Sequence, residues 1–301
     1  MDDRPLMSSS KLPLQHALAA LAVVAVWGTN FVVIKVALAV LPPLLLGVLR
    51  FALVLLPAAF FVHRPAVPWQ KLASYGVLIG AGQFGLLYLA IDGRISPGLA
   101  SLVVQTQVFF TIGLAMFVAG EQVRAFQGLA LLMATAGICV IALHTGGDIR
   151  PLGLALVLVA ALAWAGGNQV SRSMGRVDML GVVVWSSAFA VPPLLALSLI
   201  FEGPQRMAQG LAAADATVWA AVVWQAVGNS LFGYAVWGWL LSRHAAATVT
   251  PMALLVPVFG MAASAWLLGE ALPAWKLWAG ALVLSGLAVN LLWPRLVRAA
   301  A

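Results

Sequence analysis

Apolar runs of about 20 residues follow one another along nearly the whole chain, and they constrain the fold more than any other feature. A helix of that length crosses the roughly 30 Å hydrocarbon core of a bilayer. Lipid offers the backbone no hydrogen-bond partners, so helices are expected, and the runs are too long for barrel strands. Ten spans are predicted, near 15–35, 42–62, 70–91, 95–118, 124–143, 152–171, 179–201, 215–240, 246–268 and 273–293.

The composition agrees with a chain surrounded by lipid. Hydrophobic residues make up 63% of the sequence and charged residues 8%, against about 25% charged residues in soluble proteins. The segment before the first run is short and carries Asp2 and Asp3, and the run has no small-residue cleavage site. We therefore expect a retained first span and not a signal peptide. The sequence predicts an all-α integral membrane protein with the lipid bilayer as a partner.

The layout of the chain repeats. A shift of 149 positions places Gly120-Glu121 on Gly269-Glu270 and Gly137 on Gly286. Each half contains five runs, and because five is odd the second half must enter the membrane from the opposite side. The prediction is ten transmembrane helices in two inverted five-helix repeats around a central cavity, with a substrate site near the midplane. The predicted parts are a tail at 1–14, the first repeat at 15–143, a connector at 144–151, the second repeat at 152–293 and a tail at 294–301.

The basic residues are spread singly along the chain, although the net charge is +7. In the predicted topology, ten of the sixteen Lys and Arg residues lie on the side of the termini and four lie on the opposite side. The positive-inside rule therefore predicts that both termini are cytoplasmic. No basic run with interleaved aromatic residues occurs, so no nucleic-acid partner is expected.

The nine acidic residues all fall in tails, connectors or span ends of the predicted topology. Ion-coupled antiporters commonly use a carboxylate embedded in the membrane. The pattern therefore favours a facilitator that is driven by the gradient of its substrate. A connector carboxylate such as Glu121 could still reach inward, so proton-coupled export is the alternative.

Two basic residues lie within or near predicted spans. Arg50 is about eight residues into the second run, roughly 12 Å below the interface at 1.5 Å per residue. A guanidinium at that depth needs a cavity, a carbonyl cluster or a partner. Two readings stay open, a partner for a substrate carboxylate and a structural tie to the carbonyls of a broken helix. Lys35 lies close to the outer end of its run, where it can snorkel to the interface.

Amides and aromatic residues inside the runs are the candidates for lining a cavity. A mostly apolar pocket with a few polar groups suits amino acids with large side chains better than sugars or phosphates. Hydrogen bonding between helices, worth about 0.6 kcal/mol per bond, is the alternative role of each amide. The candidates are Trp27, Asn30, Gln83, Tyr88, Trp164, Asn168, Gln225, Asn229, Tyr234 and Trp237.

Helical periodicity adds two expectations about these faces. Gln225, Asn229, Gly233 and Trp237 step by four residues, so they are predicted to share one helix face. Gln105 and Gln107 should point about 160° apart on an α-helix, so we expect that they do not both line one cavity.

No motif for chemistry or for a cofactor is present. The single cysteine, Cys139, excludes a disulfide within the chain and a cysteine-rich metal site. The four histidines fall near run ends in different connectors, and no HExxH, GxSxG or acid pair occurs. An intramembrane enzyme is therefore the distant alternative, and no metal or cofactor is expected. No ring of charges or glycine-rich filter supports a channel.

The motif Trp27-Gly28-Thr29-Asn30-Phe31, its counterpart at Trp164, and Gly-Glu between the fourth and fifth spans of each half resemble the EamA-like transporters of the drug/metabolite transporter superfamily. The resemblance covers nearly the whole chain and is greatest to bacterial exporters of amino acids, especially aromatic ones. It implies a bacterial inner-membrane protein that works by alternating access. The expected function is the secondary export of small neutral metabolites, above all aromatic and other neutral amino acids, by a facilitator. The alternative is a proton-coupled exporter of drugs or other metabolites, and the oligomeric state stays open.

Overall fold

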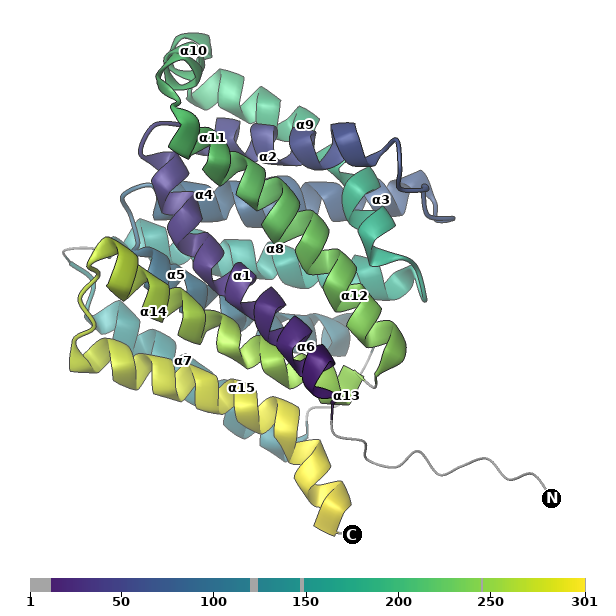
Figure 1. Cartoon of the computed structure of the whole chain (residues 1–301). Helices are drawn as coiled ribbons and strands as arrows, with labels where there is room; N and C mark the ends of the chain where they lie inside the picture. The colour runs from purple at the N-terminus through teal and green to yellow at the C-terminus, as the bar shows by residue number, and fades with distance from the viewer. Residues whose placement is uncertain (1–11, 120–123, 147–148, 245, 301) are drawn as a thin grey trace.

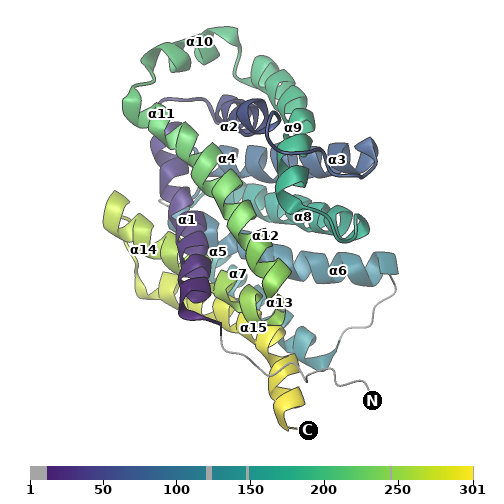
Figure 2. The ribbon, with the colours of Figure 1, turned by 45° about the vertical axis from the view of Figure 1, so that its right-hand side comes forward.

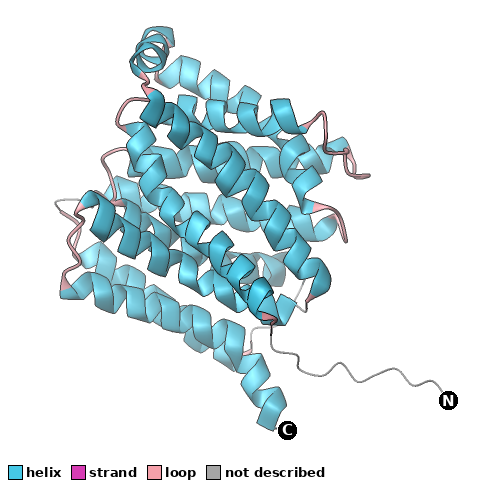
Figure 3. Ribbon diagram, in the orientation of Figure 1, coloured by secondary structure: helices cyan, strands magenta, loops and turns pink. Residues whose placement is uncertain are grey.

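The computed structural model describes residues 12–119, 124–146, 149–244 and 246–300, and these residues form helices joined by short loops, without a strand (Figure 3). The first half contains α1 (Leu14–Leu38), α2 (Pro43–Ala58), α3 (Trp69–Gly76), η1 (Val77–Gly85), α4 (Leu86–Ile91), α5 (Pro97–Val103), η2 (Val104–Thr106), α6 (Gln107–Ala119) and α7 (Ala125–Leu143). The second half contains α8 (Pro151–Ser173), α9 (Met179–Phe201), α10 (Pro204–Ala213), α11 (Ala216–Val223), η3 (Trp224–Phe232), α12 (Gly233–Arg243), α13 (Ala246–Val249), η4 (Thr250–Leu255), α14 (Val256–Leu268) and α15 (Ala274–Ala300).

Several of these elements continue one another as single long helices. Within the described residues, 8 helices are long and apolar enough to cross a membrane, or 9 if α10 and the helix 216–243 are counted as one span bent by 106°. The prediction of an all-α membrane protein is confirmed, and the described residues show 8 or 9 of the ten predicted spans by length and composition. α2 has 16 residues, which is about 24 Å of helix and short of the roughly 30 Å of hydrocarbon. The rest of its predicted run, residues 59–62, forms turns and a bend.

The helices pack into one bundle (Figures 1 and 2). α7 and α15 lie side by side along one edge, α2 and α9 pair along the opposite edge, and α1 crosses between them. α10 lies across the end of the bundle between α9 and α11 (Figure 2). α1 begins and α15 ends on the same side of the bundle, called the terminal side below, and the opposite side is called the far side.

Prolines and acidic residues define many helix ends. Proline occupies the first turn of α2, α5, α8 and α10, where its missing N–H costs nothing. Asp178 caps α9 by accepting from the amides of Leu180 and Gly181, and Asp215 caps α11 by accepting from the amide of Val218. The expectation that acids lie at span ends or in connectors is confirmed for the described ones. Glu121 lies outside the described residues.

Close backbone approaches hold the two halves together. A β-carbon added to Gly28 on α1 would lie 2.5 Å from the carbonyl oxygen of Val256 on α14, so these two helix backbones touch. Gly28 lies between Trp27 and Asn30 in the sequence, so this backbone contact also fixes the position of the backbone that carries these two side chains.

The second close approach joins α7 to α15. A β-carbon on Gly137 would lie 2.9 Å from the carbonyl oxygen of Ala279, and one on Gly286 would lie 2.6 Å from that of Ala130. Residue numbers rise on one helix as they fall on the other, so the helices run antiparallel. The pairs Gly137/Gly286 and Ala130/Ala279 are each separated by the same shift of 149 positions that relates the two Gly-Glu sequences.

Candidate functional site

A cavity of about 470 Å³ lies between the halves, and both contribute to its wall. The deep part of the wall includes Asn30, Gln83 and Asn229, which are 3%, 5% and 6% exposed. Half-buried residues such as Ser171 near the end of α8 and Asn290 on α15 complete the wall toward the terminal side. The cavity therefore extends from the middle of the bundle toward the terminal side.

The structure places most of the predicted candidates in this wall. Those that line the cavity are Trp27, Asn30, Gln83, Trp164, Asn168, Asn229, Tyr234 and Trp237. Tyr88 and Gln225 lie together elsewhere in the interior, beside Arg50. Sequence reasoning did not select Tyr75, Phe84 or Asn290, which also line the cavity. Asn290 is an amide inside the tenth run, so the reasoning that selected the other amides could have found it.

The expectation that Gln105 and Gln107 cannot both line the cavity is wrong, because both do. Gln105 lies in η2, a 3-10 segment that interrupts the helix between α5 and α6. At three residues per turn, positions two apart are separated by about 120° and not 160°. Both side chains can therefore face one broad cavity.

The prediction of one shared face for Gln225, Asn229, Gly233 and Trp237 is also wrong. Asn229 and Trp237 line the cavity, whereas the side chain of Gln225 accepts a hydrogen bond from Tyr88. The stretch Trp224–Phe232 is a π-helix, in which hydrogen bonds run from residue i to i+5, so four residues fall short of a full turn. The first half has a π-helix of the same length at Val77–Gly85, and it carries Gln83.

Hydrogen bonds fix two of the wall residues. The indole Nε1 of Trp27 donates to the backbone carbonyl of Asn229 at 3.0 Å, and this bond joins α1 to η3. The side-chain nitrogen of Asn168 donates to Gln107 Oε1 at 2.8 Å and to Thr111 Oγ1 at 3.2 Å. The ring of Trp27 is thus held in place, and its centroid lies 5.2 Å from that of Trp237.

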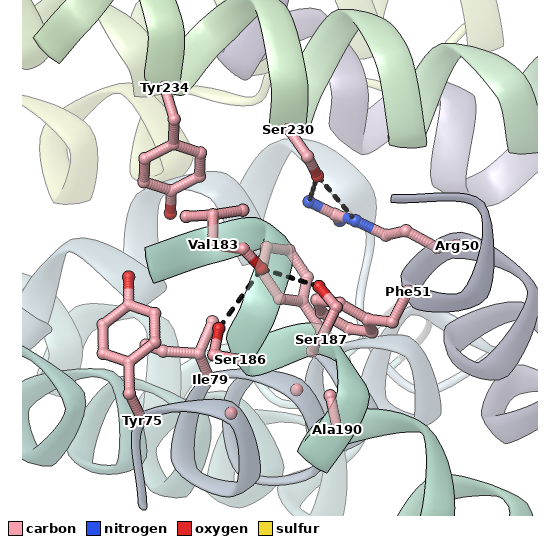
Figure 4. A pocket seen from close by; sticks show the side chains of 13 residues that line it. Arg50, Phe51, Tyr75, Ile79, Val183, Ser186, Ser187, Ala190, Ser230 and Tyr234 are labelled. Atoms are coloured by element: carbon pink, nitrogen blue, oxygen red, sulfur yellow. Dashed lines mark hydrogen bonds between the residues drawn. The ribbon is translucent and has the colours of Figure 1, made fainter. Parts of the chain in front are cut away.

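The side chain of Arg50 is buried, at 1% exposed, and its hydrogen-bond partners among the described residues are uncharged side chains. Its Nε and Nη2 donate to Ser230 Oγ at 3.3 and 2.9 Å (Figure 4), and its Nη1 donates to the hydroxyl of Tyr88 at 2.9 Å. Tyr88 in turn donates to Gln225 Oε1 at 2.5 Å. The guanidinium carbon lies 3.8 Å from the centroid of the Phe84 ring, an arrangement that stabilises a cation. The network connects the two halves.

Arg50 does not line the cavity but an adjoining pocket of about 10 Å³. Tyr75, Phe84 and Tyr234 line both spaces and so stand between them. The hydroxyl groups of Tyr75 and Tyr234 point toward one another across the small pocket (Figure 4). Any contact between Arg50 and a molecule in the cavity would require these rings to move.

Two glutamates connect the halves on the far side. Glu202 at the end of α9 accepts from the amides of Leu44 and Leu45 at 2.7 and 3.1 Å, at the first turn of α2. Glu270 accepts from the amide of Gly98 at 3.1 Å, at the first turn of α5. Carboxylates are stabilised at helix N-termini, where the amides are unpaired and the dipole is positive. The far side is therefore tied across the halves, opposite the terminal side toward which the cavity extends.

Lys35 and the acidic residues offer no further site in the described part of the chain. Lys35 Nζ donates to the carbonyl oxygen of Ile91 at 3.3 Å, at the far end of its helix. No group of three or more His, Cys, Asp or Glu residues there is placed to hold a metal ion.

Comparison with known proteins gives matches over nearly the whole chain. Residues 15–143 and 151–292 match the EamA-like transporter family. A protein of Salmonella typhimurium named "Probable amino-acid metabolite efflux pump" is 42% identical over 287 residues, which cover 93% of this chain and 96% of that protein. An uncharacterized inner membrane transporter of Escherichia coli is 31% identical over 191 residues, 58% of this chain and 61% of that protein. A crystal structure with 22% identity covers 93% of this chain and 96% of its own with a TM-score of 0.62, which shows a shared fold.

Proposed function

The chain belongs to the EamA-like transporter family and is a multi-pass membrane transporter and not an enzyme, and from this premise we propose that it exports small neutral amino-acid metabolites. Aromatic and other neutral amino acids are the proposed substrates. The name of the Salmonella typhimurium relative supports the substrate class. A bacterial inner membrane is the proposed location, in line with the name of the Escherichia coli relative.

The observation that carries this proposal is the wall of the cavity, whose described residues have aromatic, aliphatic, thioether, amide or hydroxyl side chains and include no charged one. When a ligand with a net charge moves from water into this cavity, it finds no opposite charge in the wall, and the transfer therefore costs free energy. A zwitterion carries both charges on itself, so each of its charged groups keeps an opposite charge beside it, which lowers that cost. The volume of about 470 Å³ lies within the roughly 300–1,000 Å³ of small-molecule sites.

We further propose ten membrane spans in two inverted five-helix repeats, with α2 and the helix 216–243 each counted as a span. The antiparallel contact between α7 and α15, which exchanges residues 149 positions apart, supports this arrangement. The excess of basic residues on the terminal side supports a cytoplasmic location for both termini. In that orientation the cavity extends toward the cytoplasm, as in the inward-facing state of an alternating-access cycle.

As the energy source of transport we propose the gradient of the substrate itself, so that the protein is a facilitator. The described acidic residues lie at helix ends or in connectors, and Glu202 and Glu270 are engaged by amides and hydroxyls. Proton-coupled export is the competing mechanism, and it requires a carboxylate that changes its proton during the cycle.

The experiment is uptake into liposomes that contain the purified protein, with labelled phenylalanine, threonine and methylammonium, with and without an imposed pH gradient. Flux of either amino acid that is indifferent to the pH gradient supports a facilitator. Accumulation that requires the gradient overturns the facilitator in favour of proton coupling. Flux of methylammonium alone overturns the proposed substrate class.

A further inference from the structure

Two residues that line the cavity each have a buried side-chain oxygen without a hydrogen-bond partner. Among the described residues, the buried side-chain atoms without a partner are Asn30 Oδ1 and Gln83 Oε1. Both residues line the cavity, and they come from different helices, α1 and η1. Buried polar atoms in folded proteins are nearly all paired, so two unpaired carbonyl oxygens on residues of one cavity wall require an explanation.

A bound molecule that donates hydrogen bonds would supply the missing partners once the two buried amide groups turn toward it. A carbonyl oxygen accepts and cannot donate, so the complementary group must carry N–H or O–H. A carboxylate would be repelled by these atoms. An ammonium group is the strongest complement, because it has three donors and hydrogen bonds to a charged group are stronger than neutral ones.

The rest of the cavity wall suits an ammonium group but offers it no negatively charged side chain. Its described residues include no carboxylate, so the positive charge must be balanced on the ligand itself. Trp27 precedes Asn30 by nearly one helical turn, and its ring centroid lies 5.8 Å from that of Tyr234. Because the Trp27 N–H already bonds to the carbonyl of Asn229, what the indole offers a ligand is its ring, which attracts a cation.

We propose that Asn30 and Gln83 form the subsite for the unmodified primary ammonium group of a zwitterionic substrate, and this rests on the proposed function. The subsite selects molecules that keep their N–H donors. Analogues in which the amine is fully methylated retain the charge and the zwitterion but lose every donor. These analogues are therefore rejected, although the aromatic rings alone would accept them.

The test compares phenylalanine and threonine with their N,N,N-trimethyl analogues as competitors of labelled amino acid uptake into liposomes. The net charge is the same in each pair, whereas the hydrogen-bond donors and the size of the amine differ, and the variants below separate these two differences. For the wild-type protein, the trimethyl analogue should need at least about ten times the concentration for half-inhibition, because each lost bond to a charged group corresponds to roughly a factor of ten. Equal inhibition by both members of a pair overturns the inference.

Variants locate the effect. Gln83→Met and Asn30→Leu remove the oxygens with little change of volume, and each should reduce the preference for the free amine by about tenfold. Asn30→Asp keeps an acceptor and should keep the preference. Gln105→Met removes another buried amide from the same wall and should leave the preference unchanged even if the total flux falls.

The outcomes separate this inference from the proposed function. A wild-type protein that moves neither amino acid overturns the proposed function and the inference with it. A wild-type protein that moves them and accepts the trimethyl analogues equally overturns the inference alone. Variants that keep the full preference have the same consequence for the inference, and the wild-type comparison stands if a variant fails to fold.

Discussion

Lys276 Nζ lies 3.0 Å from Glu270 Oε1, and the two side chains are 3% and 6% exposed. Glu270 also accepts hydrogen bonds from the hydroxyls of Ser96 and Ser264 and from the amide of Gly98. The carboxylate thus joins the first turn of α5 to the loop between α14 and α15. Because this ion pair is buried, removing one of its two charges should destabilise the fold more than breaking an ion pair at the surface.

Glu270→Gln should lower the free energy of unfolding by about 3–5 kcal/mol, since it removes one charge of a buried ion pair. Lys276→Met should cost less in the Glu270→Gln background than in the wild-type protein, because the pair is then already broken. Thermal unfolding of the purified protein, followed by tryptophan fluorescence, measures both. The control is Asp92→Asn, whose pair with Arg94 spans 3.7 Å and is about one-third exposed, so the change should cost under about 1 kcal/mol. Equal losses in Glu270→Gln and Asp92→Asn would contradict the role assigned to burial.

Gly28→Ala should destabilise the protein by about 1–3 kcal/mol, because the added methyl group overpacks the contact between α1 and α14. The new carbon would lie 2.5 Å from both the carbonyl oxygen of Val256 and the β-carbon of Phe259. Gly113→Ala is the matched control, since nothing lies within 4 Å of its added carbon, and a helix gains up to about 1 kcal/mol from this change. The same unfolding measurement compares them, and a stable Gly28→Ala protein would show that the two backbones can separate.

Arg50→Lys should lower thermal stability and maximal flux while the concentration for half-maximal flux changes less than about twofold. Lysine is a point charge and cannot hold Ser230 and Tyr88 together as the guanidinium fork does. Each lost bond to the charged group costs about 1.5–3 kcal/mol. A large rise in the half-maximal concentration at unchanged stability would favour the carboxylate-partner reading of Arg50 over the structural tie.

Trp164→Ala and Tyr234→Ala should each reduce amino acid flux by about tenfold, since both rings line the cavity and aromatic side chains carry much of the contact energy of such sites. Trp278 is 69% exposed, and Trp275 stacks on His144 with ring centroids 4.6 Å apart. Changing either of these to Ala should reduce flux less than twofold per amount of folded protein. Similar losses at all four positions would count against the assignment of the cavity.

Single cysteines should report the sidedness of the cavity. Cys139 is exposed and can be replaced by Ala to give a background without a thiol. Ser171→Cys at the terminal side should then react with an impermeant maleimide only after the membrane is opened, whereas Asp92→Cys on the far side should react in intact cells. The reverse pattern would overturn both the orientation and the inward-facing state.

The apolar spans and their ends were largely predictable from the sequence, because lipid leaves few choices to the backbone. The starting points of α9 and α11 could be predicted from Asp178 and Asp215, because aspartate commonly caps the N-terminus of a helix. The bend between α10 and α11 and the short α2 were not predictable. The run that contains α2 stays apolar beyond Ala58, so hydrophobicity alone does not show where the helix ends.

The candidate site was predictable in composition but not in the direction of each side chain. Reasoning with a uniform α-helical period misplaced Gln225, because η3 is wound as a π-helix, and misjudged Gln105, because η2 is wound as a 3-10 helix. The sequence of these stretches carries no signal for the change in winding that we could identify. Arg50 was singled out correctly as a buried cation, but its neutral partners come from helices far apart in the chain.

The exchanged contacts between α7 and α15 bear on the ancestry of the chain. Gly137 meets Ala279 and Gly286 meets Ala130, so each half supplies one glycine and one carbonyl to this contact. A protein of half this length could form the same contact by pairing with a second copy inserted upside down. Fusion of two such genes would preserve this interface while the loops elsewhere diverged in length.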